Sequence, residues 1–312
     1  MSKPAATLAV IALAAVCLLT GCPGDDDDGG KKNPPPPSPV TEAEVLGPAP
    51  GGTADPDGGP AVALTVSGRV QYERLIATVN GLEAMPLIVD AAGVVVEAVV
   101  HNNHNSVIQS TSTDLSGNYS FSLSVNADFY IRARAQDAAT GDDRVYHSQV
   151  VPTVVHAVSS PVINRAGGNQ TVDITATASG PDIRSGAFAA LDTVRGLRAQ
   201  VASSFPALGR IDLFWGPENH GTSYQQTSFG QAIPINGTFF IFPGPFANPS
   251  IFLLGGRTGF LADSDHDEFD QTVIAHEWAH VFSFRESRDN NFGGPHAGEE
   301  LLPSVAYSEG FA

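Results

Sequence analysis

Two histidines four residues apart constrain the fold of this chain more than any other feature. The segment His276–His280 reads His-Glu-Trp-Ala-His, and helical residues four apart share a face, so both imidazoles can reach one metal ion. Glu277 is placed to take a proton from a metal-bound water instead of binding the metal. Apolar residues form a stripe along the same helix, as a buried helix requires. This stripe argues against a surface helix that carries two histidines by chance. These residues are Val273, Ile274, Trp278, Val281 and Phe282.

A catalytic zinc ion normally needs a third protein ligand and an open position for water. Ser283 and Glu286 stand where a longer metal motif would have its Gly and its third His. Downstream, Pro303 is well placed to begin a second helix, with Glu309 one to two turns in. This arrangement resembles the gluzincin metallopeptidases, in which a Glu followed by Gly or Ala on a second helix supplies the third ligand.

The resemblance extends over roughly residues 185–312, to a group of bacterial lipoprotein metallopeptidases. Its other motifs are an apolar strand at 250–255, an acidic loop at 263–270, a Ser-Arg and Gly-Gly-x-His stretch at 287–296, and Ser-Glu-Gly at 308–310. The resemblance implies one Zn²⁺ held by His276, His280 and Glu309, with Glu277 as general base. His296 is a candidate to support the ligands or contact a tetrahedral intermediate, and an ordinary loop histidine is the alternative. The related proteins usually have Gly at the position of Ala279.

The chain ends three residues after Glu309, whereas a gluzincin catalytic domain normally continues as a helical lobe. We therefore expect the metallopeptidase domain, residues 181–312, to be C-terminally truncated. Two hypotheses follow: an active peptidase, or a surface-tethered binding lipoprotein whose peptidase domain is inactive.

The N-terminus predicts a lipoprotein signal peptide over residues 1–21. Lys3 precedes an apolar run from Ala5 to Leu19 that is too short to span a bilayer comfortably, and the run leads into Leu-Thr-Gly-Cys22. Lipidation of Cys22 would anchor the chain to a membrane, whereas an ordinary secretory signal is the alternative. Proline after Cys22 favours the outer membrane or cell surface over the inner membrane. The expected location is therefore the cell envelope.

Residues 22–61 are expected to form a disordered, acidic and proline-rich tether. Four consecutive aspartates, 25–28, stand between glycines, and 34–39 is almost entirely proline. The formal net charge of −17 makes the chain a poor candidate for nucleic-acid binding, which needs the opposite sign. Cleavage before Cys22 would leave no thiol except the modified one, which excludes disulfides and a thiolate-rich structural zinc site.

Short alternating runs between turn signals predict an all-β sandwich over residues 62–180. Alternation is clearest from Tyr119 to Val125, and the residues 114–118 before it predict a hairpin. The stretches 113–121 and 129–134 resemble the carboxypeptidase regulatory-like, transthyretin-like domain. His101 and His104 are more typical of a surface than of a metal site. No catalytic set is visible in this part, so binding, spacing or support is its expected role.

Residues 181–312 predict an α+β domain of zincin type. The residues 188–201 have the spacing of an amphipathic helix, and 211–215, 238–242 and 250–254 predict strands. We expect Ile251–Leu254 to be the edge strand that borders the substrate cleft and pairs with an extended peptide.

Alternate acids at Asp263, Asp265 and Asp267 precede the metal helix. Acids are favoured at a helix start by capping and by the helix dipole, whereas their spacing also suggests a Ca²⁺ loop.

The predicted function is that of a lipid-anchored zinc metallopeptidase that acts on a peptide or protein substrate. We expect an endopeptidase, because no residues for binding a free terminus are visible.

Overall fold

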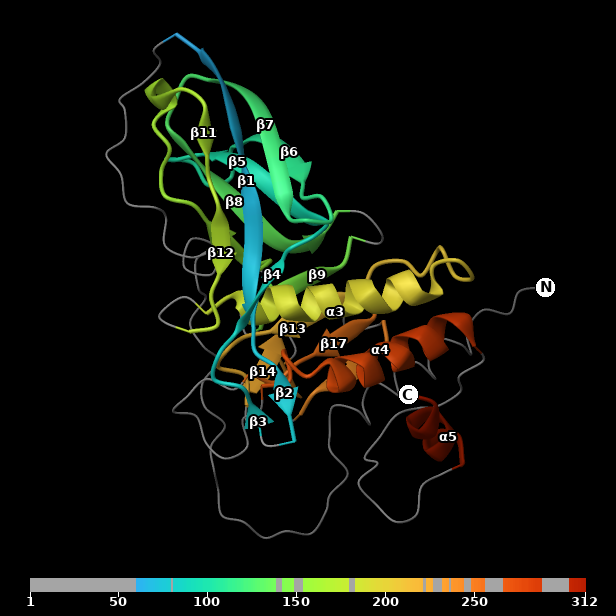
Figure 1. Ribbon diagram of the computed structural model, residues 1–312. Coiled ribbons are helices and arrows are strands. Elements are labelled where there is room, and N and C mark those ends of the chain that lie inside the picture. Colours follow the sequence, from blue (N-terminus) through green and yellow to red (C-terminus); the bar gives the residue numbers. More distant parts are fainter. Residues whose placement is uncertain are drawn as a thin grey trace, which may run out of the picture.

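The computed structural model in Figure 1 describes residues 60–79, 81–138, 142–148, 154–179, 183–220, 223–226, 232–235, 237–243, 248–255, 266–287 and 303–312. The predicted signal peptide, Cys22 and nearly all of the predicted tether lie outside these residues. The described part is rich in β structure, as predicted. None of its helices combines the length and the apolar character needed to span a bilayer.

The first sheet is built on the long strand β1 (Val62–Arg74). Its first half pairs with β7 (Asn118–Val125) and with β11 (Gln170–Thr171), and its second half pairs with β4 (Leu87–Asp90) and with β12 (Ile174–Ala176). The strict alternation of exposed and buried residues along β7 shows why it forms here. One face of the strand meets the core and the other meets solvent.

The second sheet has the strand order β16-β17-β13-β9-β8-β5-β6, with β10 also paired to β8. The strands from the first part of the chain are β5 (Val94–Val100), β6 (Val107–Ser112), β8 (Phe129–Asp137), β9 (Arg144–His147) and β10 (Ala157–Ser159). Those from the last part are β13 (Asp212–Trp215), β16 (Phe239–Ile241) and β17 (Ser250–Phe252). Since β9 pairs with β13, the sheet continues across the division that the sequence suggests at residue 180.

Smaller elements complete the described part. Two short antiparallel ribbons pair β2 (Ala77–Thr78) with β3 (Gly81–Leu82) and β14 (Ser223–Gln226) with β15 (Ala232–Ile235). A single turn of 3-10 helix, η1 (Arg165–Gly167), precedes β11. These elements lie outside the two main sheets.

The turn at 114–118 is present, but the predicted hairpin is wrong. The Asp114 carboxylate accepts hydrogen bonds from the backbone N–H groups of Ser116 and Asn118, and Gly117 has a φ of 74°. However, β6 pairs with β5 and β7 pairs with β1, so the turn carries the chain from one sheet to the other. Asx turns and positive-φ glycines predict a change of direction and leave the partner of the next strand open.

The helix α3 (Ser185–Val201) confirms the predicted amphipathic helix. It packs on both sheets, and its Phe188 stacks on Tyr72 of β1 with ring centroids 6.5 Å apart. The Tyr72 hydroxyl donates a hydrogen bond of 2.8 Å to Asp192 on the same helix. The helix α4 (Gln271–Glu286) lies beside α3, as Figure 1 shows. The helix α4, which carries the predicted metal ligands His276 and His280, is therefore supported by α3 and, through it, by both sheets.

The predicted strands near the metal helix form, but the edge assignment is wrong. The strand β17 lies inside the sheet, and the described edge is β16, which runs antiparallel to it with Phe240 opposite Ile251. Strand order depends on pairing between distant segments, which local sequence does not encode.

Side chains alternate between the two faces of this part of the sheet. Phe239 stacks on Phe252, and Phe252 stacks on Phe214, at centroid distances of 5.0 and 4.8 Å. These rings belong to one apolar cluster, whereas Phe240 packs against the main core on the side of the helices. The pleat therefore turns Phe240 toward α4.

Candidate metal centre

The helix that carries the two histidines begins at a built N-cap. Asp270 is extended, and its carboxylate accepts hydrogen bonds from the backbone N–H groups of Thr272, at 2.8 Å, and Val273, at 3.3 Å. Partial burial raises the pKa of Asp270, but these bonds and one from the Thr272 hydroxyl outweigh it and hold the pKa below its usual value. The capping role expected of an acid at this helix start is therefore confirmed.

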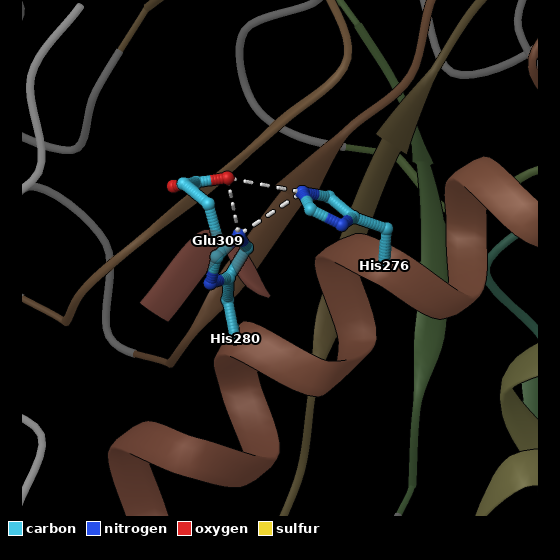
Figure 2. Close-up of side chains that lie close together, drawn as sticks. All are labelled: His276, His280 and Glu309. Atoms are coloured by element: carbon cyan, nitrogen blue, oxygen red, sulfur yellow. Dashed lines mark hydrogen bonds and ion pairs between the residues drawn. The ribbon is translucent and has the colours of Figure 1, made fainter. Parts of the chain in front are cut away.

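A second helix, α5 (Pro303–Phe311), begins at the proline that the sequence marks as a helix start. It places Glu309 opposite the histidine face of α4. Figure 2 shows the Glu309 carboxylate directed at His276 and His280, whose rings lie on successive turns of α4. The structure therefore brings together the three side chains that the sequence proposes as metal ligands.

The three facing atoms form a nearly equilateral triangle. The two Nε2 atoms of His276 and His280 are 3.2 Å apart, and Glu309 Oε2 lies 3.3 Å from the first and 3.5 Å from the second. Within the described residues, these side chains form the single group of three or more His, Cys, Asp or Glu with donor atoms close enough to share a metal ion.

The triangle matches the face of a zinc tetrahedron. Zinc bonds to imidazole nitrogen and carboxylate oxygen are about 2.0–2.2 Å long, so two ligands of a tetrahedral ion lie about 3.3–3.5 Å apart. The three observed separations fall close to this range. Three mutual hydrogen bonds are a poorer explanation, because two neutral imidazoles offer only one proton each and the N–H···O distances exceed the usual 2.7–3.2 Å. The donor set fits zinc.

Glu277 lies on the same helix but is more enclosed than the proposed ligands. Its exposed fraction is 8%. The pKa of Glu277 is raised to about 8, mainly by burial; a hydrogen bond from the Phe240 backbone opposes this rise, and the nearby carboxylates of Glu309 and Asp267 contribute to it. A carboxyl group with a pKa near neutrality can both accept and return a proton, as a general base and acid must.

Aromatic side chains border the centre beside the edge strand. The ring of Phe240 lies parallel to that of His280, within 13°, at a centroid distance of 6.4 Å. Phe242 contacts both Phe240, at 4.9 Å, and Phe284, at 5.1 Å. Phe240, Phe242 and Phe284 are partly exposed, so they can contact an apolar group beside the three proposed ligands.

The described acids before α4 have specific partners. The Thr238 hydroxyl donates to Asp267, and the same hydroxyl accepts from the backbone N–H of Leu254 at 3.0 Å. The buried Glu268 carboxylate lies 3.1 Å from His266 Nδ1, and burial raises the pKa of Glu268. The first contact joins the acidic turn to Thr238, directly before β16, and the second lies within the turn. The proposed calcium ligands Asp263 and Asp265 lie outside the described residues, as does His296.

Ser308 belongs to the Ser-Glu-Gly motif, but the sequence assigned no functional role to Ser308, Phe240 or Thr238. The Ser308 hydroxyl lies 3.3 Å from His280 Nδ1. Each of these residues reaches the centre through packing between segments far apart in the chain, and each residue type is common elsewhere. The position of Ser308, directly before the proposed third ligand, was the one local signal available. In the region predicted to be a sandwich, His104 bonds to the Tyr130 hydroxyl at 2.8 Å, and His101 is buried, not exposed as expected.

Comparison with known proteins adds little to this geometry. No protein-family model matches the chain, and no curated protein matches it. A solved structure of a candidate carbohydrate-binding protein from Pseudomonas aeruginosa is 13% identical and covers 38% of this chain and 90% of its own, with a TM-score of 0.24. A likeness this weak carries no information about fold or function.

Proposed function

We propose that this chain is a zinc metallopeptidase of gluzincin type, with His276, His280 and Glu309 as metal ligands and Glu277 as general base. The observation that carries this proposal is the triangle of donor atoms with sides of 3.2, 3.3 and 3.5 Å. It joins side chains from two helices, and His280 and Glu309 are 29 positions apart in the chain. Its size suits a zinc ion bound on one side and open to solvent on the other.

The reaction proposed for the site is hydrolysis of a peptide bond. When bound, zinc supplies a Lewis acid that polarises a carbonyl group and acidifies water. Glu277 removes a proton from the attacking water and later delivers it to the leaving amine. The pKa of Glu277 is expected to fall below about 8 when a dication binds beside it, because a positive charge favours the carboxylate.

The edge strand gives this proposal a place for the substrate. An extended peptide can add to a sheet edge through main-chain hydrogen bonds, and β16 is the described edge on the side of α4. The Phe240 backbone also bonds to Glu277. A peptide lying along β16 would therefore pass close to the general base. Among the described residues, β16 has no strand partner other than β17, and such an arrangement suits endopeptidase activity.

The proposal includes attachment to the cell envelope through a lipidated Cys22, with a tether between the membrane and the first sheet. It also includes a sandwich domain of the carboxypeptidase regulatory-like, transthyretin-like kind. The role proposed for this domain is to support the catalytic part. The sequence motifs described above are the support for both points.

Replacing Glu277 by Gln tests the mechanism. The amide keeps the shape of the side chain but cannot take a proton, so we expect hydrolysis of a quenched fluorescent peptide library to fall about 10²–10⁴-fold. Zinc content should stay unchanged, because Glu277 is not a proposed ligand. The matched control is Glu286→Gln at the exposed end of the same helix, which should retain activity. Full activity in Glu277→Gln, or zinc-loaded wild-type protein with no hydrolysis, would contradict the proposed function; the second result favours a binding lipoprotein.

A further inference from the structure

The helix α5 contacts the metal centre through two consecutive residues. Glu309 faces the Nε2 atoms of both histidines, whereas the Ser308 hydroxyl lies 3.3 Å from the other ring nitrogen of His280. Ser308 is almost completely enclosed, with an exposed fraction of 2%. This buried hydroxyl is thus held against the far side of a proposed ligand.

The chemistry of imidazole gives this contact a direction. A neutral imidazole carries one proton, so one nitrogen donates a hydrogen bond and the other accepts one or binds a metal. If His280 Nε2 is to offer its lone pair to the triangle, the proton must be on Nδ1. The Nδ1–H group then donates to Ser308 Oγ. The Ser308 hydroxyl can accept this bond, so the contact supports the tautomer that metal binding requires.

The other histidine is held less firmly. The side chain of His276 is 35% exposed, against 12% for His280. Among the hydrogen bonds between described residues, none involves His276 Nδ1, whereas His280 Nδ1 has Ser308. Orientation of the pair therefore depends mainly on His280, which the second helix holds from both sides of its ring.

We propose that Ser308 is a positioning residue that fixes the ring of His280 for metal binding, so that the docking of α5 both supplies the third ligand and orients the second. This inference rests on the proposed zinc site. It predicts that the hydroxyl of Ser308, and not merely its volume, determines how tightly zinc is held.

The test compares zinc affinity in four full-length chains: the wild type, Ser308→Ala, Ser308→Thr and the control Ser304→Ala one turn earlier on α5. Zinc dissociation constants are measured by competition with a chelator in detergent solution. We expect Ser308→Ala to bind zinc about 10–100-fold more weakly, as losses of such outer contacts usually do. Ser308→Thr keeps the hydroxyl and should restore most of the affinity, and Ser304→Ala should resemble the wild type.

A second measurement separates orientation from general damage to the fold. Nitrogen-15 NMR of the imidazoles in the zinc-loaded wild type should show His280 with its proton on Nδ1, and the thermal unfolding midpoints of the metal-free variants should show whether they fold. Wild-type affinity in Ser308→Ala, equal losses in the Ala and Thr variants, or an unprotonated Nδ1 would overturn the role of Ser308 and leave the zinc site intact. A wild-type chain that binds no zinc would overturn both proposals.

Discussion

His156 shows how differently a histidine can be used in this molecule. It is fully buried; its Nε2–H donates to the Trp215 carbonyl at 3.0 Å, and its Nδ1 accepts from the Arg184 guanidinium at 3.3 Å. Burial lowers the pKa of His156 well below its usual value, and the neighbouring His147 and Arg184 lower it further. Both ring nitrogens are satisfied only in the neutral form. The side chain is therefore structural, in contrast to the paired histidines of α4.

This burial predicts a loss of stability in mild acid. The pKa of His156 is about 6.5 in the unfolded chain and lower in the folded one, so between these values the unfolded state binds the extra proton. Its contribution to stability is complete above about pH 6.5 and is lost as pH falls below it, at up to about 1.4 kcal/mol per pH unit. His156→Gln keeps a donor for Trp215 and removes the titration.

Urea unfolding at pH 7, 6 and 5 measures this effect. The free energy of unfolding should fall more steeply in the wild type than in His156→Gln. Buried carboxyl groups such as Glu268 and Asp143 have raised pKa values and act in the opposite sense, but they are present in both proteins and cancel in the difference. Parallel pH profiles for the two proteins would show that His156 does not titrate on unfolding.

At the scale of elements, the helices of the metal centre depend on signals next to them in the sequence. Asp270 caps α4, Pro303 opens α5, and the spacing of the two histidines sets one face. For this reason both helices and the two histidine ligands could be predicted from local signals, whereas Glu309 was proposed from the resemblance to the gluzincins. The edge strand could not be predicted: β16 and β17 are both short and largely apolar, and only the further pairing of β17 with β13 shows that β16 is the outer of the two. The same limit explains the hairpin that was expected before β7.

The cap of α4 gives a prediction at this scale. Asp270→Ala removes the acceptor for the Thr272 and Val273 N–H groups, and we expect it to lower the free energy of unfolding by about 1 kcal/mol. Asp270→Asn keeps a capping oxygen and should lose much less. Chemical denaturation of the metal-free protein measures both. Equal stability of Asp270→Ala and the wild type would mean that packing alone fixes the start of the helix.

The whole molecule is organised around a sheet to which both halves of the sequence contribute. The parallel pairing of β13 with β9 joins them, and α3 packs on both sheets and on α4. Arg198 of α3 forms a buried ion pair with Asp143, which also accepts the backbone N–H of Ile211 at 2.7 Å. The sequence correctly indicated strands in both parts, but composition and turn signals do not reveal that they share one sheet. The helix α4, proposed to bind the metal, is therefore supported by residues from the predicted sandwich.

The central claim is that α4 and α5 hold one zinc ion between them. X-ray absorption at the zinc edge, on the full-length chain loaded with one equivalent of zinc, tests it most directly. The account predicts scattering from two imidazoles together with oxygen ligands at about 2.0–2.2 Å, and fewer oxygen ligands or weaker zinc retention after Glu309→Ala. Zinc that shows no imidazole scattering, or a spectrum and affinity unaffected by Glu309→Ala, would contradict it.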